Sequence, residues 1–362
     1  ADRAWHELQA RMHAARNLKP RVPRELQAEL RPYQKEGFRW LARLSAWDAG
    51  ACLADDMGLG KTLQTLAVLV TRKSHGPTLV VAPTSVGPNW LREAARFTPS
   101  LRVRHFHGPG REALLDDLGP GDLLVTSYGT LTVDAEALAE VRFDTLVFDE
   151  AQAIKNPRTR RARAARSLDG RWRLALTGTP VENHLGELWS IFSVLSPGLL
   201  GPWKSFQERF AAPIERDGDR DRLEALSRLM RPFVLRRTKD KVAPELPART
   251  EVLEPVELSP AERALYEAAR REALAELLEG GVDEGDKLQV LAALTRLRRL
   301  ACHPKLVQAN FTGASSKLSS LLEHLYDVRR ARQRALVFSQ FTTFLDLVRA
   351  QLEREGFEYL YL

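Results

Sequence analysis

The sequence predicts an α/β fold in which a parallel sheet is buried by helices on both faces. From about residue 30 to 180, short apolar and β-branched runs alternate with longer helical stretches. The runs are apolar throughout, as in strands that are covered on both sides. Polar, glycine-containing motifs follow several runs, at the strand ends where such sheets bind ligands. The expected strands are 51–53, 78–82, 123–126, 145–148 and 173–176, separated by helices such as 62–72 and 89–97.

Composition sets broad limits on the protein class. The 362 residues, 44% of them hydrophobic, suffice for two to three domains at roughly 150 residues each. The net charge of +7 favours a polyanionic partner, although a solvated basic surface gives the same total. Cys52 and Cys302 cannot form a disulfide framework, which favours a reducing cytoplasm. The sequence shows neither a signal peptide nor an apolar run of membrane-spanning length, so we expect no membrane partner.

The order of these patterns predicts the domain organisation. We expect an N-terminal helical tail at 1–29, a first lobe at 30–240 with a helical protrusion at 185–230, a linker and second helical protrusion at 241–314, and the start of a second α/β unit at 315–362. In the second protrusion, Ser259 and Pro260 form an expected N-cap and first position of a helix at 260–279. The second α/β unit is expected to open with a strand at 335–341, followed by a helix.

A candidate phosphate-binding loop, DDMGLGKT, occupies residues 55–62 between an expected strand and an expected helix. Gly58 and Gly60 allow a tight turn whose N–H groups point at a phosphate, and the helix N-terminus adds a favourable dipole. Lys61 would bind the β- and γ-phosphates, and the Thr62 hydroxyl would bind Mg²⁺. Asp55 replaces the first glycine of the full motif, so a plain glycine-rich turn is the alternative. The expected ATP contacts are Asp56, Met57, Gly58, Leu59, Gly60, Lys61 and Thr62.

A second candidate motif, TLVFDEAQ at 145–152, is an apolar strand that ends in two carboxylates. Beside the phosphate loop, Asp149 would hold Mg²⁺ and Glu150 would polarise the attacking water. Any lone Asp-Glu pair is more simply a solvated turn. The order and spacing of the two motifs favour phosphate hydrolysis, with Lys61, Asp149 and Glu150 as catalytic residues.

Further segments resemble the SWI/SNF family of helicase superfamily two, of bacterial or archaeal type. They are LRPYQKEGFRWL (30–41), LVVAPTSVGPNW (79–90), LLVTSYGTL (123–131), LALTGTPVENHLGELWS (174–190), RPFVLRRTKDKVAPELP (231–247), LRRLACHPKLV (297–307) and SSKLSSLL with ALVFSQF (315–341). The resemblance implies a complete RecA-like lobe with helical protrusions and an incomplete second RecA-like lobe. The long runs at 231–247 and 297–307 distinguish the chain from generic helicases.

The resemblance also implies roles for individual residues. Gln34 would recognise the adenine edge, although an ordinary amphipathic helix explains its segment equally well. Gln152 stands in the acidic motif where many members carry histidine. Coupling between nucleotide and domain closure would pass through Thr177, Gly178 and Thr179. Small donors at strand ends would contact the DNA backbone, with strand-end capping as the alternative: Thr84, Ser85, Asn89, Thr126 and Ser127.

By this resemblance the parent protein uses ATP and Mg²⁺ to move along double-stranded DNA without separating the strands. Its location would be cytoplasmic and nucleoid-associated, with DNA-bound proteins or RNA polymerase as further partners. Alternatives are a strand-separating helicase, a P-loop ATPase independent of nucleic acid, and a non-hydrolysing binding module. The motifs that carry arginine fingers in the second lobe do not occur in this sequence. We therefore expect ATP binding with little turnover, unless Arg236 or Arg237 completes the site.

Three other features suggest simpler interpretations. The seven arginines within 158–173 form either a DNA track or, more simply, a solvated helix face. Cys302 and His303 lack a second pair at metal-ligand spacing and indicate packing at a helix end. Five tryptophans are expected in the core: Trp40, Trp90, Trp172, Trp189 and Trp203.

Overall fold

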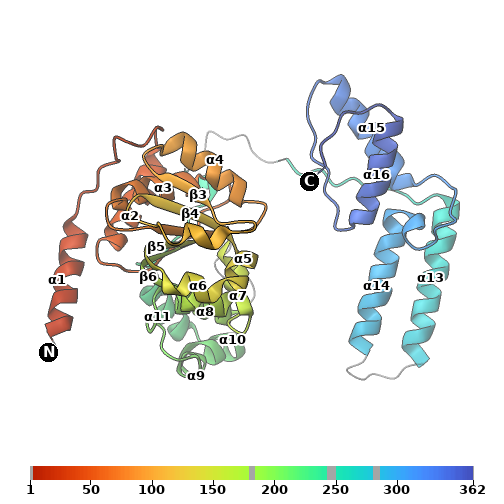
Figure 1. Cartoon of the computed structure of the whole chain (residues 1–362). Coiled ribbons are helices and arrows are strands. Elements are labelled where there is room, and N and C mark those ends of the chain that lie inside the picture. The colour runs from red at the N-terminus through yellow and green to blue at the C-terminus, as the bar shows by residue number, and fades with distance from the viewer. Residues whose placement is uncertain (1–2, 179–183, 243–249, 280–285, 362) are drawn as a thin grey trace. The chain divides into compact units, whose positions relative to one another are not determined.

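The computed structural model describes residues 3–178, 184–242, 250–279 and 286–361 (Figure 1). The chain divides into two compact units, Ala1–Ala248 and Arg249–Leu362. Each is considered by itself below. Within the described ranges, no helix has both the length and the apolar character needed to cross a membrane.

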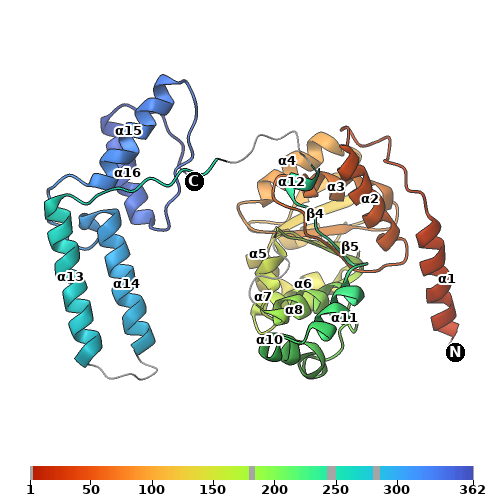
Figure 2. The same ribbon diagram turned by 180° about the vertical axis from the view of Figure 1, so that it is seen from behind.

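A parallel sheet organises the first unit. Among the described residues it contains seven strands, in the order β3-β4-β2-β5-β6-β1-β7. Every recorded pairing between neighbouring strands is parallel. The strands are β1 (Ala51–Leu53), β2 (Thr78–Ala82), β3 (Arg102–His105), β4 (Asp122–Ser127), β5 (Arg142–Phe148), β6 (Asp169–Leu176) and β7 (Val234–Leu235). Helices lie on both faces of the sheet (Figures 1 and 2), which confirms the predicted fold class.

Two apolar cores sandwich this sheet, and the inner strands contribute residues to both. In β2, Val80 packs with the helices on one face, while Leu79 and Val81 pack with those on the other. The first core includes α2 (Pro32–Ser45), α3 (Lys61–Arg72) and α4 (Gly87–Phe97). The second includes α5 (Tyr128–Val133), α6 (Ala135–Glu140), α7 (Arg160–Ser167) and α8 (Leu185–Leu195). Because both faces are buried, the strands have no polar alternation.

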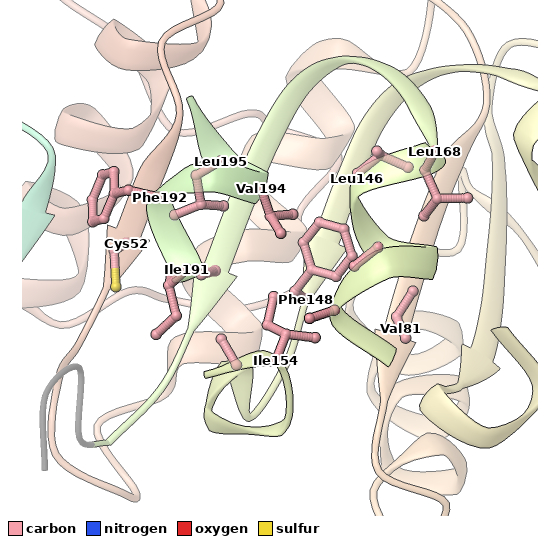
Figure 3. Packing of buried hydrophobic residues seen from close by; sticks show 14 of the residues in the cluster. Cys52, Val81, Leu146, Phe148, Ile154, Leu168, Ile191, Phe192, Val194 and Leu195 are labelled. Carbon is pink, nitrogen blue, oxygen red and sulfur yellow. The ribbon is translucent and has the colours of Figure 1, made fainter. Parts of the chain in front are cut away.

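The second core fixes the end of β5 relative to the helices that pack on the same face of the sheet. Figure 3 shows Phe148 pointing into a group that includes Ile154, just past the strand, and Ile191 of α8. All three side chains are at most 1% exposed. Dense packing of this kind leaves little freedom to the strand end. It therefore holds the carboxylates that follow Phe148 in a defined position.

The remaining elements of the first unit are mostly short helices. They are α1 (Arg3–Asn17), η1 (Arg111–Leu114), η2 (Ala151–Ile154), α9 (Trp203–Phe206), η3 (Gln207–Ala211), α10 (Ala212–Asp217), α11 (Arg220–Met230) and α12 (Lys239–Val242). Helix α1 lies within the region 1–29, and helices α8 to α11 lie within the region 185–230. Trp90 and Trp172 are fully buried, as expected for core aromatics. Trp203 is not, because it is 37% exposed and packs edge-on against Trp189.

Two strands, β3 and β7, were not predicted from the sequence. The edge strand β3 reads Arg-Val-Arg-His, and both arginines bond Asp122 of β4. Its solvent-facing charges hide the apolar signal that marks the inner strands. The other strand, β7, has only two residues and lies in a region expected to be mostly helical. Its hydrogen bonds to β1 are what identify it: Cys52 N donates to Phe233 O at 2.8 Å, and Ala54 N donates to Leu235 O at 2.7 Å.

The regular elements among the described residues of the second unit are all helices. Its elements are α13 (Pro260–Glu279), α14 (Asp286–Cys302), η4 (Pro304–Leu306), α15 (Ser316–Arg330) and α16 (Thr342–Arg354). The predicted N-cap is confirmed, because Ser259 Oγ accepts from Glu262 N and the Glu262 carboxylate accepts from Ser259 N. Helices α13 and α14 lie side by side in Figures 1 and 2 and are joined by an Arg296–Glu272 ion pair. A small core forms around Phe344, Val348 and Leu352 of α16.

The prediction of a strand at 335–341 is wrong. This segment has no strand hydrogen bonding, and Leu336 and Phe338 are 82% and 86% exposed. Its apolar, β-branched composition suits a strand, but a strand forms only against a neighbour with free backbone groups. Within the described residues of the second unit there is no such neighbour. The helix expected to follow is present as α16.

The structure agrees with a solvated helix face for the arginines that begin the 158–173 run, and with packing at a helix end for Cys302 and His303. Arginines 158, 160, 161 and 163 are exposed, whereas the alanines between them are buried. Arg173 instead donates to the carbonyls of Val194 and Leu168, which ties β6 to α8. His303 is buried at the end of α14 and packs edge-on against Phe311. Across the described residues there is no cluster of three metal-ligating side chains.

Candidate nucleotide and DNA site

The candidate residues meet at one edge of the sheet. The strands run parallel, so the segments that follow β1, β2, β4, β5 and β6 all lie at the carboxyl edge. Backbone hydrogen bonds join them, from Asp149 N to Val81 O at 2.8 Å and from Thr177 N to Leu53 O at 3.1 Å. The phosphate loop, the acidic pair and the coupling motif are therefore neighbours in space.

The phosphate loop turns through two glycines. Gly58 has φ 82° and Gly60 has φ 75°, both in the left-handed region that favours glycine. Gly60 precedes α3, which begins at Lys61. The Lys61 ammonium donates to the carbonyls of Asp55 and Asp56 at 2.7 and 3.5 Å, so it lies against the loop. Met57 is 63% exposed at the tip, whereas Leu59 is buried. This is the strand–loop–helix arrangement that binds phosphate at a helix N-terminus.

Gln34 joins α2 to this loop. Its Oε1 accepts from Arg31 N at 2.9 Å, and its Nε2 donates to Leu59 O at 3.2 Å. A Cβ at position 60 would lie 2.4 Å from this Nε2, which adds a second reason for glycine there. Gln34 is buried, and both ends of its amide have partners in the protein. Its expected contact with adenine stays a prediction.

Asp55, which replaces the first glycine of the motif, has a structural role that the sequence did not reveal. It is fully buried and forms an ion pair with Arg237, whose Nε donates to Oδ1 at 2.9 Å. The backbone N–H of Arg237 donates to the same oxygen at 3.1 Å. Arg237 also donates to Gln64 Oε1 at 2.9 Å and to the Tyr33 carbonyl. One arginine thus links the segment after β7 to the phosphate loop, to α3 and to α2.

The next residue of the loop makes a parallel connection. Asp56 N donates to Arg237 O at 3.0 Å, and Asp56 Oδ2 accepts from Lys239 N at 3.0 Å. The Lys239 side chain passes over the loop, 3.7 Å from where a Cβ on Gly58 would be. No local sequence pattern predicts that residues 237 and 239 lie beside residues 55 and 56. Only the pairing of β7 with β1 brings them together.

The first carboxylate of the acidic pair is enclosed by hydrogen-bond donors. Asp149 Oδ2 accepts from Trp90 Nε1 at 2.7 Å, and Oδ1 accepts from Glu150 N at 2.9 Å. Burial raises the pKa of Asp149 and the nearby Glu150 charge raises it further, against the lowering effects of Trp90 and Lys61. The Lys61 ammonium therefore acts electrostatically on Asp149, so the two catalytic candidates share one site.

Glu150 begins a chain of side-chain hydrogen bonds. Its Oε2 accepts from Gln152 Nε2 at 2.7 Å, and Gln152 Oε1 accepts from Thr177 Oγ1 at 3.1 Å. Glutamine thus bridges the acidic pair and the coupling motif at the position where many family members carry histidine. Glu150 has φ 47°, a left-handed backbone that costs a non-glycine residue about 1–2 kcal/mol. Such strain concentrates at functional sites. Gly178 follows at the strand end, and Thr179 lies outside the described residues.

The five candidate DNA contacts differ in accessibility. Thr84 and Ser85 are exposed in the turn between β2 and α4. Asn89 is half-buried, and its amide donates to Glu93 Oε1 at 2.9 Å. Ser127 caps α5 by accepting from Thr130 N at 3.0 Å. Thr126 is 2% exposed and donates to the Phe106 carbonyl at 3.1 Å, so we remove it from the candidate contacts. Its side chain is buried and therefore has no surface that DNA could contact.

A family model described as "SNF2-related domain" matches residues 33–306. The chain belongs to the SNF2-related family. This match includes the phosphate loop, the acidic pair and the residues around Arg237, and it confirms the resemblance seen in the sequence.

Curated SNF2-related proteins from bacteria and eukaryotes are similar to this chain. The Bacillus subtilis protein named "Putative ATP-dependent helicase/translocase YwqA" is 40% identical over 95% of the chain and 39% of its own length. The Arabidopsis thaliana "ISWI chromatin-remodeling complex ATPase CHR17" is 33% identical over 93% of the chain and 33% of its own length. The chain thus spans between a third and two-fifths of these relatives.

A solved SNF2-related structure is also similar. The Sulfolobus solfataricus SWI2/SNF2 ATPase core in complex with dsDNA is 36% identical, with a TM-score of 0.61. The match covers 94% of this chain and 73% of the archaeal chain. The Sulfolobus solfataricus SWI2/SNF2 ATPase core domain gives a TM-score of 0.58, also at 36% identity.

Proposed function

We propose that the chain is the ATP-binding part of a motor that hydrolyses ATP to move along double-stranded DNA without separating its strands. The observation that carries this proposal is the meeting of Lys61, Asp149 and Glu150 at one sheet edge, in a chain of the SNF2-related family. The first unit corresponds to the first ATPase lobe. Duplex DNA would associate the protein with the nucleoid, where DNA-bound proteins or RNA polymerase are the further partners.

The proposed chemistry assigns a task to each side chain. Lys61 neutralises charge on the β- and γ-phosphates, while the N–H groups of residues 56–62 surround them. Glu150 orients the attacking water, and its link through Gln152 to Thr177 couples that orientation to the coupling motif. Gln34, which is hydrogen-bonded to Leu59 O, would recognise the adenine edge.

The donor set also fits Mg²⁺. This ion prefers oxygen ligands, keeps several waters and binds to one or two protein groups together with phosphate oxygens. Thr62 supplies a hydroxyl at the start of α3, and Asp149 supplies a carboxylate at the end of β5. When bound there, Mg²⁺ would neutralise the charge that develops on the phosphates. Thr62 and Asp149 are therefore the proposed Mg²⁺ residues.

DNA binding is proposed on the surface beside this edge. Thr84, Ser85, Asn89 and Ser127 follow β2 and β4, two neighbouring strands. Their hydroxyl and amide groups suit phosphate contacts, which position a duplex without selecting a sequence. The similarity to an archaeal core in complex with dsDNA supports a duplex as the partner.

Two substitutions separate nucleotide binding from hydrolysis. Lys61→Ala should weaken MgATP binding, because the γ-phosphate loses a lysine partner. Glu150→Gln should preserve binding and abolish even the slow phosphate release expected of the unmodified chain, since water activation is lost while Asp149 and Lys61 remain. Titration of labelled ATP with Mg²⁺, followed by single-turnover phosphate release, measures both.

Arg142→Ala serves as the control for these variants, because Arg142 is an exposed basic residue at the start of β5, away from the carboxyl edge of the sheet. Equal affinity in Lys61→Ala and the unmodified chain would exclude the loop from nucleotide binding. Full phosphate release by Glu150→Gln would exclude Glu150 as the residue that activates water.

A further inference from the structure

Two buried aromatic side chains donate hydrogen bonds to Asp149, and they come from two different strand-end segments. Trp90 Nε1 donates to the Asp149 carboxylate at 2.7 Å. Tyr128 OH donates to the Asp149 main-chain carbonyl at 2.8 Å. Trp90 is fully buried and Tyr128 is 4% exposed, so water competes with neither bond. Both the side chain and the backbone of Asp149 are thereby fixed by residues outside β5.

The origin of the two donors connects them to the proposed DNA surface. Trp90 lies in the first turns of α4, next to Asn89 and directly after the exposed turn of Thr84 and Ser85. Tyr128 is the first residue of α5, next to its N-cap Ser127. Each of the two segments proposed to contact DNA therefore also contains a buried aromatic residue, Trp90 or Tyr128, that donates a hydrogen bond to Asp149.

We propose that Trp90 and Tyr128 are positioning residues that transmit duplex binding to Asp149 and thereby control how the site binds Mg²⁺ with nucleotide. This inference rests on the proposed function. A shift of either DNA-contacting segment moves a donor that is rigidly packed and bonded to the aspartate, because a buried ring cannot turn independently of its helix. Conversely, metal bound at Asp149 would bias the positions of α4 and α5, since coupling between two sites is reciprocal.

The test compares Trp90→Phe and Tyr128→Phe with the matched control Trp172→Phe. Trp172 is equally buried and donates its indole N–H to Ala49 O at 2.8 Å, toward the amino ends of the strands and away from the carboxyl edge. Tyr128→Phe removes only a hydroxyl, so it keeps the packing of the ring. Circular dichroism and thermal unfolding establish that each variant is folded before binding is measured.

The first measurement is the Mg²⁺ concentration that gives half-maximal binding of a non-hydrolysable ATP analogue to residues 1–362. Trp90→Phe should raise this concentration roughly tenfold, the usual loss when a partner of a metal-binding side chain is removed. Trp172→Phe should leave it unchanged. Equal Mg²⁺ requirements in Trp90→Phe and Trp172→Phe would overturn the positioning role of Trp90.

The second measurement is the ratio of analogue affinities with and without a saturating duplex. We expect a ratio of about fivefold or more in the unmodified chain and in Trp172→Phe, and a ratio near one in Trp90→Phe and Tyr128→Phe. Binding of analogue and duplex without mutual influence in the unmodified chain would overturn this inference and leave both proposed sites intact. Failure of the unmodified chain to bind either ligand would overturn the proposed function as well.

Discussion

At the scale of single residues, the most consequential pair is Asp55 and Arg237. Asp55 is fully buried, and its carboxylate accepts from the side chain and backbone of Arg237 and, at 3.4 Å, from Gln64 Nε2. Arg237 additionally lies over the Tyr33 ring, with its guanidinium 5.4 Å from the ring centre. A buried carboxylate in this position needs its partner, because an unpaired charge in an apolar interior is strongly unfavourable.

Arg237→Ala should therefore lower the free energy of unfolding of the first unit by about 3–5 kcal/mol, the usual cost of leaving a buried charge unpaired. Urea denaturation monitored by circular dichroism measures the change. Arg236→Ala is the control, since the neighbouring arginine is exposed and its loss should change stability by roughly 0.5 kcal/mol or less. Similar stabilities of the two variants would show that Asp55 finds other donors.

The same pair shows why part of the site could not be predicted from sequence. Lys61, Thr62, Asp149 and Glu150 stand in local motifs, each directly after an apolar strand, and chain order alone placed them at one edge. Arg237 follows a strand of only two residues and is 182 residues away from Asp55. Nothing local marks such a contact, because it depends on which strand β7 joins.

At the scale of elements, burial decided which strands were predictable. β2 matches its expected bounds, and β4, β5 and β6 differ at their ends by a few residues, because apolar runs buried on both faces are unambiguous. β3 was missed since its side chains face solvent at the sheet edge. The segment 335–341 was wrongly assigned for the opposite reason: its residues favour a strand, but the described residues of the second unit provide no strand to pair with it.

Hydrogen exchange should reveal this difference between elements directly. The amides of 335–341 have no strand partners, so they should exchange within seconds at neutral pH. The amides of Thr145–Phe148 in β5, hydrogen-bonded between β2 and β6, should be protected for hours or longer. Mass spectrometry of peptic peptides compares the two segments in one sample. Slow exchange at 335–341 would mean that this segment pairs in solution.

At the scale of the whole molecule, the proposed partner is a polyanion recognised through its backbone. The net charge of +7 is modest, so binding should depend on the local donors and basic side chains near the carboxyl edge. Such contacts release counterions from the duplex but carry no sequence information. Both properties can be measured on the chain without any enzymatic turnover.

Affinity for duplex DNA should fall with salt, with a slope of about 0.9 in log K against log salt for each phosphate neutralised. It should differ little between duplexes of unrelated sequence. Fluorescence anisotropy with two labelled duplexes over a range of KCl concentrations tests both expectations, and Thr84→Ala with Ser85→Ala should weaken binding equally for both sequences. A salt-independent affinity, or strong preference for one duplex, would contradict backbone recognition.

The position of β7 also has a consequence for synthesis on the ribosome. Residues 50–60 emerge well before Arg237, so Asp55 acquires its partner only when a further 182 residues have been translated. Until then the nascent lobe contains an incomplete sheet edge at β1 and a carboxylate with no counter-ion to bury it against. The phosphate loop is therefore among the last parts of the lobe to mature during translation, although it is translated before most strands of the lobe. The loop reaches its final structure only after Arg237 has been synthesised.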